Sequence, residues 1–367
     1  MWNLLSITTL LIGVIAVSPN PPVSRPTKGT IELVGRMRVA RAAATATTIA
    51  GDRVLIAGGM TEGGGALREY EVFDASTNHV VALGEMDEPR VGHSATKLSD
   101  GRVLILGGYN GSYLKSAAIF DPRTARVTTA GSMNVGRSGH TATLLRNGTV
   151  FITGGVGDGW SFLASAEVYD PQTARFTPVK SMSFARESHT ATLLRDGRVL
   201  IAGGHRDRRE NIVVYASTEI YDPVKRDFSA GPYLTAARHK HEAVGLADGR
   251  VLVVGGSDPR DHTHFTSAEV YDPTVNRWSA VSPMRIGRYK LRDTALRLRD
   301  GRVLVAGSGR FAETFDPHTN AFSSVDGDFG QEYSFASAVL LDDGRAIVLG
   351  GYDSSSRNSD GIWRFRE

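Results

Sequence analysis

The sequence has 367 residues, of which 41 are glycine, 8% are aromatic and none is cysteine. The absence of cysteine excludes disulfides, thiolate metal sites and cysteine nucleophiles. The formal net charge is +3 and there is no long run of lysine or arginine, so we do not expect a nucleic-acid partner. Abundant glycine without a Gly-X-Y period favours a turn-rich, all-β chain.

The N-terminus contains a short apolar stretch, from Leu4 to Val17, which is followed by a proline-rich segment. The stretch is shorter than a membrane span requires, and the prolines after it cannot continue a helix. This pattern is typical of a secretory signal peptide. We therefore expect a signal peptide over residues 1–18, a linker over residues 19–29, and an extracytoplasmic location that is periplasmic, secreted or at the cell surface. An uncleaved N-terminal anchor is the alternative, and no other membrane association is expected.

Seven internal repeats follow, and each contains a pair of glycines, degenerate in one copy, at the end of an apolar run. The pairs lie 43 to 52 residues apart, at Gly58-Gly59, Gly107-Gly108, Gly154-Gly155, Gly203-Gly204, Gly255-Gly256, Gly307-Ser308-Gly309 and Gly350-Gly351. Before each apolar run stands a turn signal, mostly Asp-Gly or Asn-Gly, which suits a two-residue type I′ hairpin. After each pair come a variable loop, a strand that mostly ends in Tyr-Asp or Phe-Asp, a turn and a fourth strand.

Each repeat therefore predicts four antiparallel strands, and radial stacking of such sheets covers both of their apolar faces. The last repeat has only three strands, because the chain ends after the segment 361–365. The orphan segment 30–37 matches the fourth-strand pattern of the other repeats. We therefore expect the N-terminal strand to complete the last sheet and to close the ring, which removes an open edge.

The twin glycines, the Tyr-Asp pair and the aromatic residue after it resemble the kelch-repeat family over residues 30–367. The resemblance implies an all-β, seven-bladed kelch β-propeller domain over residues 30–367, with four antiparallel strands per blade. Galactose-oxidase-like proteins share this fold, and their copper site uses a tyrosine crosslinked to a cysteine. Because this sequence has no cysteine, the radical chemistry is not expected to carry over, and we expect no cofactor.

Two features recur at the same place in several repeats and are interpreted as scaffold. The first is Arg-x-x-His, at Arg90/His93, Arg137/His140, Arg186/His189 and Arg238/His241. The second is a glutamate before the Tyr-Asp or Phe-Asp pair, at Glu71, Glu167, Glu219, Glu269 and Glu313. A buried carboxylate needs a partner, and the repeated arginines are the natural one. The second repeat carries Ala118 at the glutamate position, which the sequence alone does not explain.

Function is expected where the repeats differ, in the loops after the twin glycines of the fourth and fifth repeats. The candidate binding residues are Arg206, Arg208, Arg209, Asp258, Asp261, His262, His264 and Phe265. His262-x-His264 with the aspartates could ligate a divalent metal, but the spacing is not specific, so no metal site is assigned. The alternative is that these insertions are only tolerated surface loops.

The sequence contains no recognisable nucleophile–base pair, phosphate loop or HExxH motif. We therefore expect a non-catalytic binding or interaction scaffold whose partner is a carbohydrate or a protein or peptide. One alternative is an enzyme of the galactose-oxidase-like or sugar-mutarotase-like type that acts through the variable loops. Another is a structural or adhesion role without a small ligand.

Export with cleavage is directly testable. Mass spectrometry of exported protein should show a mature N-terminus between residues 17 and 25, because the apolar stretch ends just before the proline cluster. An intact Met1 on exported protein would instead favour the uncleaved anchor.

Overall fold

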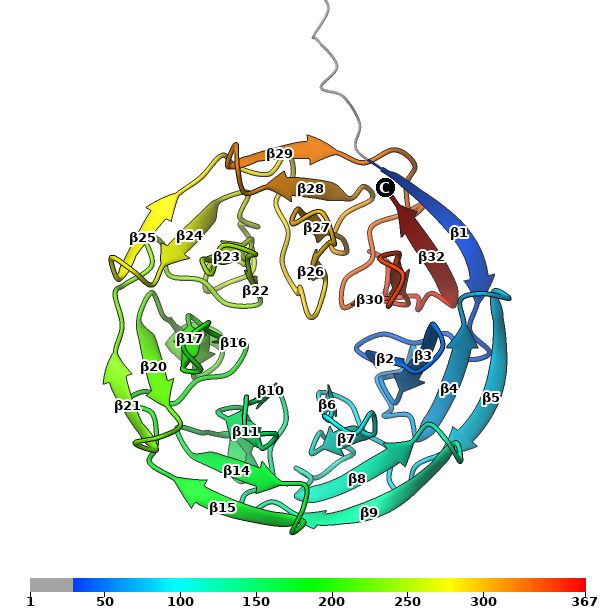
Figure 1. The fold of residues 1–367 in the computed structure, drawn as a ribbon, viewed down its shortest axis with the longest axis horizontal. Coiled ribbons are helices and arrows are strands. Elements are labelled where there is room, and N and C mark those ends of the chain that lie inside the picture. Colours follow the sequence, from blue (N-terminus) through cyan, green and yellow to red (C-terminus); the bar gives the residue numbers. More distant parts are fainter. Residues whose placement is uncertain (1–28) are drawn as a thin grey trace, which may run out of the picture.

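The computed structural model describes residues 29–367, which form a ring of seven four-stranded antiparallel sheets (Figure 1). The predicted seven-bladed all-β propeller is confirmed. The predicted signal peptide, and the linker except for Gly29, lie outside the described residues. Among residues 29–367, no helix has the length and apolar character needed to cross a membrane.

The first three blades follow one another in chain order, from the innermost strand to the outermost. Blade one consists of β2 (Thr45–Ile49), β3 (Arg53–Ala57), β4 (Glu69–Asp74) and β5 (His79–Glu85). Blade two consists of β6 (Ser94–Lys97), β7 (Val103–Leu106), β8 (Ser116–Asp121) and β9 (Arg126–Ser132). Blade three consists of β10 (Thr141–Leu144), β11 (Val150–Thr153), β14 (Ala166–Asp170) and β15 (Arg175–Val179).

The remaining blades repeat this order. Blade four consists of β16 (Thr190–Leu193), β17 (Val199–Ala202), β20 (Thr218–Asp222) and β21 (Asp227–Ala230). Blade five consists of β22 (Glu242–Gly245), β23 (Val251–Val254), β24 (Ala268–Asp272) and β25 (Arg277–Ala280). Blade six consists of β26 (Ala295–Arg297), β27 (Val303–Val305), β28 (Glu313–Asp316) and β29 (Ala321–Ser324). Blade seven consists of β30 (Ser337–Leu340), β31 (Ala346–Leu349), β32 (Gly361–Arg366) and β1 (Thr30–Arg36).

The core lies between the blades, where the apolar faces of neighbouring sheets meet. Seven clusters of buried side chains, one at each blade interface, fill these spaces. Between blades three and four, for example, the rings of Phe151 and Tyr221 stack with their centroids 4.0 Å apart. The second strand of each blade is therefore buried on both faces, which explains why its sequence shows no apolar–polar alternation.

The N-terminal strand closes the ring as expected. β1 pairs with the C-terminal strand β32, and Ile31 and Leu33 lie opposite Phe365 and Trp363. The main-chain N–H of Ile31 also donates to Asp326 O at 2.8 Å, which ties β1 to the end of blade six. The two ends of the described chain thus share one sheet.

The turns between the first two strands of a blade differ from the expectation. At Asp100-Gly101 only the glycine has a positive φ, and Leu98 O accepts from Gly101 N at 3.0 Å, while Leu98 N donates to Arg102 O at 2.8 Å. This is a three-residue loop with a left-handed glycine, so the type I′ prediction is wrong. The aspartate favours this loop because its Oδ1 accepts from Arg102 N at 3.0 Å. The same glycine bond recurs at Leu145–Gly148, Leu194–Gly197, Leu246–Gly249, Leu298–Gly301 and Leu341–Gly344.

A buried arginine ties each of blades one to six to its neighbour. In blade three, Arg137 donates from Nη1 to Gly154 O at 2.8 Å and from Nη2 to Glu167 Oε1 at 2.9 Å. Its own carbonyl accepts from Gly108 N of blade two at 2.9 Å. The other oxygen of Glu167 accepts from Asn134 N, in the segment that links the two blades, at 2.8 Å. The equivalent ion pairs are Arg41–Glu71, Arg186–Glu219, Arg238–Glu269 and Arg288–Glu313.

Blade two keeps this arrangement with a different carboxylate. Ala118 occupies the glutamate position, and Glu88 from the preceding linking segment places Oε2 3.5 Å from Arg90 Nη2. Ser116 completes the cluster, since its hydroxyl accepts from Arg90 Nη2 at 3.2 Å and donates to Glu88. The buried guanidinium therefore has a carboxylate partner without a glutamate on the strand.

The repeated histidines also belong to the scaffold. Each ring is buried and contacts a hydroxyl on the innermost strand of the preceding blade, in the pairs Thr45–His93, Ser94–His140, Thr141–His189 and Thr190–His241, at 2.9 to 3.3 Å. Burial lowers the pKa of His189 to about 3, so this ring is neutral. These contacts confirm the structural interpretation of the Arg-x-x-His repeat.

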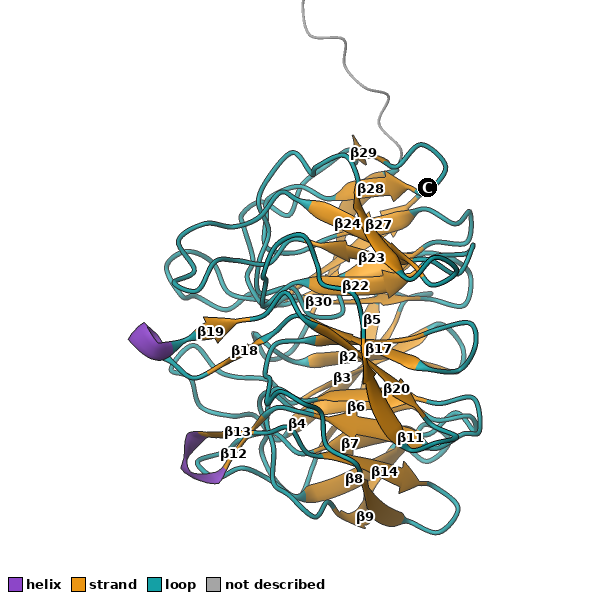
Figure 2. Ribbon diagram, turned by 90° about the vertical axis from the view of Figure 1, so that its left-hand side faces the viewer, coloured by secondary structure: helices purple, strands orange, loops and turns teal. Residues whose placement is uncertain are grey.

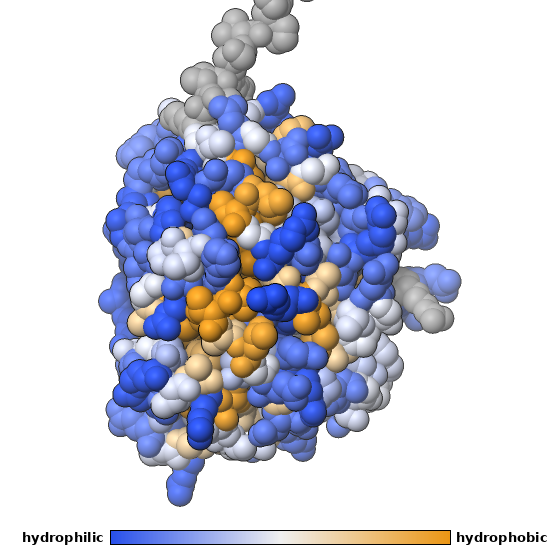
Figure 3. Space-filling view, turned by 90° about the vertical axis from the view of Figure 1, so that its right-hand side faces the viewer, coloured by the Kyte–Doolittle hydropathy of each residue, from blue (hydrophilic) through white to orange (hydrophobic). Residues whose placement is uncertain are grey.

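One flank of the outer rim exposes several large apolar side chains. Leu33 on β1 and Val81 and Leu83 on β5 are exposed large apolar residues, and Figure 3 shows apolar side chains gathered on this flank. The outermost strands are covered on one face only, so alternate residues of β5 face solvent.

Removing the Glu88 carboxylate from blade two should destabilise the protein. Adding a glutamate at the strand position that the other blades use should reverse the loss of stability. Glu88→Ala removes the carboxylate partner of Arg90, and we expect a loss of about 1–2 kcal/mol, since Glu88 is partly exposed. Adding Ala118→Glu supplies the carboxylate that other blades use. Chemical denaturation of the single and double variants measures both effects, and a double variant no more stable than Glu88→Ala would contradict the assignment.

Candidate functional site

Two small β-hairpins project from one end of the propeller (Figure 2). The first belongs to blade three and consists of β12 (Val156–Gly157), the 3₁₀ turn η1 (Asp158–Trp160) and β13 (Ser161–Phe162). The second belongs to blade four and consists of β18 (His205–Arg206), η2 (Arg209–Asn211) and β19 (Val213–Val214). We call this end the loop face. The opposite end carries the short turns, including those at Asp-Pro.

A groove of about 1250 Å³ lies between these hairpins and the blade-five loop. We call it the hairpin groove. The first hairpin contributes Trp160 and Phe162, the second contributes Arg208, and the blade-five loop contributes Arg260 and His262. The groove thus combines exposed aromatic surface with charged groups.

Arg208 and Trp160 form one wall of the groove as a stacked pair. The guanidinium carbon of Arg208 lies 4.0 Å from the Trp160 ring centroid, and Nη2 lies 3.6 Å from Glu187 Oε2. Trp160 is 55% exposed and has a left-handed backbone (φ 62°), which is uncommon for a large residue. The hairpin therefore holds a tryptophan at the surface, with a cation fixed against it.

Behind this wall, four titratable side chains form a chain of contacts. Glu187 Oε2 lies 3.5 Å from His205 Nε2, and His205 Nδ1 lies 3.2 Å from His239 Nδ1. His239 Nε2 contacts Asp261 Oδ1 at 3.2 Å and Asp258 O at 3.0 Å. Because Nε2 of His239 faces only acceptors, it carries the proton and donates.

Burial and hydrogen bonds together shift the pKa values of these contacting side chains. Burial lowers the pKa of His205 to about 3, so its ring is neutral, and burial raises the pKa of Glu187. The pKa of Asp261 lies well below its usual range, because hydrogen bonds from His239, Lys240 and Ser257 outweigh the effect of burial. Lys240 donates to Asp261 Oδ2, and Ser257 donates to Oδ1 at 2.6 Å. The carboxyl pKa values at the two ends of this row of side chains are therefore shifted in opposite directions, upwards at Glu187 and downwards at Asp261.

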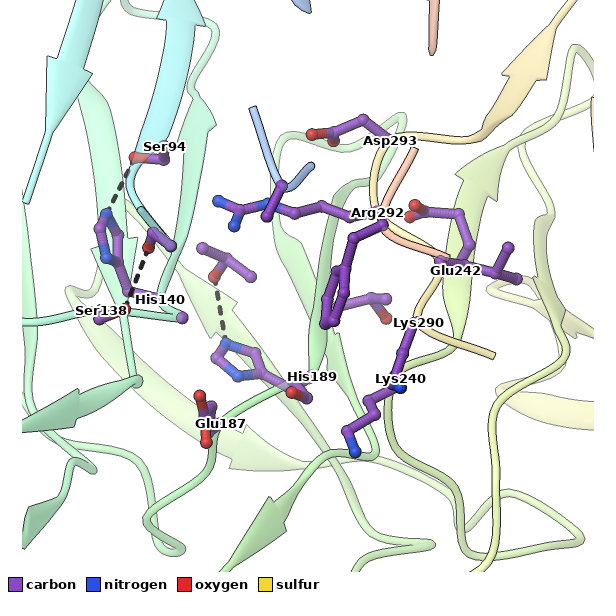
Figure 4. A pocket seen from close by; sticks show the side chains of 18 of the residues that line it. Ser94, Ser138, His140, Glu187, His189, Lys240, Glu242, Lys290, Arg292 and Asp293 are labelled. Carbon is purple, nitrogen blue, oxygen red and sulfur yellow. Dashed lines mark hydrogen bonds between the residues drawn. The ribbon is translucent and has the colours of Figure 1, made fainter. Parts of the chain in front are cut away.

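A second cavity, of about 490 Å³, lies in the central channel (Figure 4). We call it the channel pocket. It shares His205, Arg208 and Lys240 with the hairpin groove, and Glu187 lines it from the other side of His205. The chain of titratable groups thus separates the two cavities and faces both.

One backbone position at the mouth of the channel has a positive φ in all seven blades. Its residues are Ala43, Gly92, Gly139, Ser188, Lys240, Lys290 and Phe335, in blade order. Blades one to four have small residues there, whereas blades five to seven have two lysines and a phenylalanine. Left-handed backbone is uncommon outside glycine, asparagine and aspartate, so long side chains at this position are unusual and distinguish blades five to seven from the others. They make one half of the channel mouth charged and bulky.

Glu242 is the deepest carboxyl group of the channel pocket. Its Oε1 accepts from Ala243 N at 3.0 Å and its Oε2 from Thr294 N at 3.3 Å. Burial, with a smaller contribution from the charge of Asp293, raises its pKa to about 8. The group is therefore mostly protonated near neutral pH.

The structure brings three of the residues predicted from sequence to the hairpin groove, namely Arg208, Asp261 and His262. Arg206 is exposed, does not line the groove, and places Nη1 3.3 Å from Asp207 Oδ2. Arg209 lies in η2.

The other three residues contact their own loop or the scaffold. Asp258 Oδ1 accepts from the main-chain N–H groups of Arg260 and His262, at 3.2 and 2.9 Å. The ring of His264 stacks on Tyr289 at 3.6 Å, and that of Phe265 lies 5.6 Å from the Arg238 guanidinium carbon. Within the described residues, no three histidine, aspartate or glutamate side chains form a group that could hold a metal ion.

Sequence reasoning missed Trp160, Phe162 and Glu187. A signal for the first two was present, because two aromatic residues stand in the short loop between the twin glycines and the next strand. For Glu187 the signal was a departure from the repeat, since blades two and three carry Val91 and Ser138 at this position. Both signals are differences in residue type between repeats, and neither is a difference in loop length.

Comparisons with known proteins agree with the fold. The family model described as the KLHDC2/KLHL20/DRC7 Kelch-repeats domain matches residues 27–204, and the Kelch motif model matches residues 243–285. The F-box/kelch-repeat protein SKIP20 of Arabidopsis thaliana is 31% identical over 109 residues, which are 28% of this chain and 26% of that protein. A second F-box/kelch-repeat protein of the same plant is 29% identical over 109 residues, with the same coverage. The chain thus matches about a quarter of the length of these relatives.

Among solved structures, a fungal alcohol oxidase in complex with copper is similar in fold. The TM-score is 0.74 and the sequences are 16% identical, over 92% of this chain and 76% of the oxidase chain. At this identity the similarity concerns the fold alone.

The raised pKa of Glu242 predicts a pH-dependent stability. Its pKa is higher in the folded state than in the unfolded chain, so its contribution is complete below about pH 4.5 and is lost as the pH rises through about 8. Relative to Glu242→Gln, the wild type should lose up to about 1.4 kcal/mol of unfolding free energy per pH unit between pH 5 and 8. Urea denaturation across this range measures the difference. Parallel curves for the two proteins would show that Glu242 does not titrate in this way.

Proposed function

Because the chain is a kelch-repeat β-propeller, we propose that it is a binding scaffold that docks a segment of a protein partner on its loop face. The partner segment lies in the hairpin groove. The scaffold contributes rigidity, since the buried arginines fix the blades and the hairpins extend from them. A preformed groove loses little conformational entropy when a ligand binds.

The stacked pair of Trp160 and Arg208 is the observation that carries the proposal. Tryptophan and arginine are the residues most enriched among those that dominate binding energy at protein interfaces. Here the ring is half-exposed, and the guanidinium that covers part of it keeps N–H groups available to a ligand. This chemistry suits a peptide with an apolar side chain next to an acidic one.

We also propose that the partner is met outside the cytoplasm, on the basis of the apolar N-terminal stretch. A carbohydrate is the alternative ligand, because an exposed tryptophan next to polar groups also suits a sugar ring. The enzymatic alternative has less support, since the structural similarity to a copper oxidase concerns the fold alone.

Selection from a random peptide library displayed on phage, against the immobilised protein, tests the proposal. Enriched peptides should bind in fluorescence anisotropy, and Trp160→Ala or Arg208→Ala should each weaken them about 10- to 100-fold, as expected for dominant interface residues. Glycan arrays with the same variants test the carbohydrate alternative.

Matched controls lie on the opposite end of the propeller. Arg123→Ala removes an exposed arginine, and Val224→Ala removes an exposed apolar residue, from the end that carries the short turns. Neither variant should change peptide affinity. If these variants lose binding while the groove variants keep it, the partner site has been placed at the wrong end.

A further inference from the structure

The channel pocket departs from the repeat in blades five and six. In blades one to four, the first residue of the innermost strand is a hydroxyl that contacts the histidine of the next blade. Blade five has Glu242 at this position, and the facing residue of blade six is Leu291. In blade six the innermost strand starts at Ala295, seven residues after Arg288, whereas in blade three it starts four residues after Arg137. The longer connection places Arg292 at the pocket.

Arg292 extends into the middle of the channel pocket (Figure 4). Its Nη2 donates to the main-chain carbonyl of His93, on the far side of the ring in blade two. That acceptor is neutral. Among the described residues, no carboxylate forms an ion pair with Arg292, so its charge is not compensated by a direct partner.

Lys290 is a second cation of the channel pocket that forms no ion pair with a carboxylate of the described residues. Its Nζ donates to Tyr352 Oη at 2.8 Å and lies 4.6, 5.3 and 5.9 Å from the ring centroids of Tyr289, Tyr352 and Phe335. Burial lowers the pKa of Lys290, but the hydrogen bonds that its ammonium donates to Tyr289 and Tyr352 raise it by more, so the ammonium is retained. The aromatic rings hold the charge in place but do not neutralise it.

The other charges of the pocket offset these two cations only in part, through Asp293, which also lines the pocket. Arg208 and Lys240 already face Glu187 and Asp261, respectively. Glu242 is mostly protonated near neutral pH. In the half of the pocket formed by blades five to seven, Lys290 and Arg292 therefore outnumber the single remaining carboxylate, that of Asp293, and leave an excess of positive charge.

We propose that the channel pocket binds a small anionic ligand, a carboxylate or a phosphate ester, between Lys290 and Arg292. Its volume of about 490 Å³ lies within the range of small-molecule sites. Arginine offers a fork of donors that matches carboxylate and phosphate oxygens, and lysine adds a compact charge. This site goes beyond the proposed partner docking in the hairpin groove and does not depend on it.

Isothermal titration calorimetry at constant ionic strength, with four probes, tests the site. Glucuronate and citrate represent carboxylates, glucose 6-phosphate represents phosphate esters, and glucose is the uncharged match for two of them. At least one anion should bind saturably with a dissociation constant below about 1 mM, and glucose should not bind. The preferred probe distinguishes the two classes of anion.

Variants locate the site. Lys290→Met and Arg292→Gln should each weaken the preferred anion about tenfold or more, and Arg206→Gln, at an exposed arginine of the loop face, should not. Thermal melts confirm folding, and Arg292→Lys, which keeps the charge, should retain more affinity than Arg292→Gln. Absence of binding by every anion, or equal binding by wild type, Lys290→Met and Arg292→Gln, would overturn the proposal. Peptides selected for the hairpin groove should still bind both pocket variants, so the two proposals fail independently.

Discussion

The buried arginine at the start of each of blades one to six is the interaction on which the rest of the structure depends. Its carbonyl receives the N–H of a twin glycine from the preceding blade, and its guanidinium bonds the twin-glycine carbonyl of its own blade. The glutamate that pairs with it also anchors the linking segment. One residue therefore sets the distance between two sheets and the course of the chain between them. A charge so deeply buried is costly unless it is paired and hydrogen-bonded. The terminal nitrogens of these guanidinium groups have such partners, whereas among the six arginines only that of blade one, Arg41, has a partner at Nε.

Repetition explains which features could be predicted. The strand order, the closure by residues 30–37 and the pairing of Glu167-type residues with arginines each follow from a pattern seen many times in one sequence. The turn geometry at Asp100-Gly101 could not be read in this way, because a dipeptide is compatible with more than one loop and the hydrogen bond from Arg102 N to Asp100 selects between them. The role of Glu88 depends on spatial proximity to Arg90, which spacing along the chain does not reveal.

The candidate site was predicted less completely, for a physical reason. Loop length pointed to the face that carries the hairpin groove and included Arg208, but the direction of a side chain depends on its neighbours. His264 stacks on Tyr289 and Phe265 covers Arg238, so residues that look available in the sequence contact the scaffold. Conversely, Glu187 stands on a short linking segment, lines the channel pocket and contacts His205, which lines both cavities. Single-residue departures from a repeat, such as Lys290 in place of glycine, were more informative than insertions.

The pairing of β1 with β32 also has a consequence for the order in which this molecule can be made. The strand that completes the last sheet is synthesised before the other strands of the ring, and its partner is synthesised after them. Until that partner is synthesised, β1 has no sheet to join, and every growing intermediate is an open arc with apolar surface at both ends. Ring closure therefore waits for β32 and joins segments more than three hundred residues apart, a separation that makes closure slow by the general dependence of folding rate on contact order.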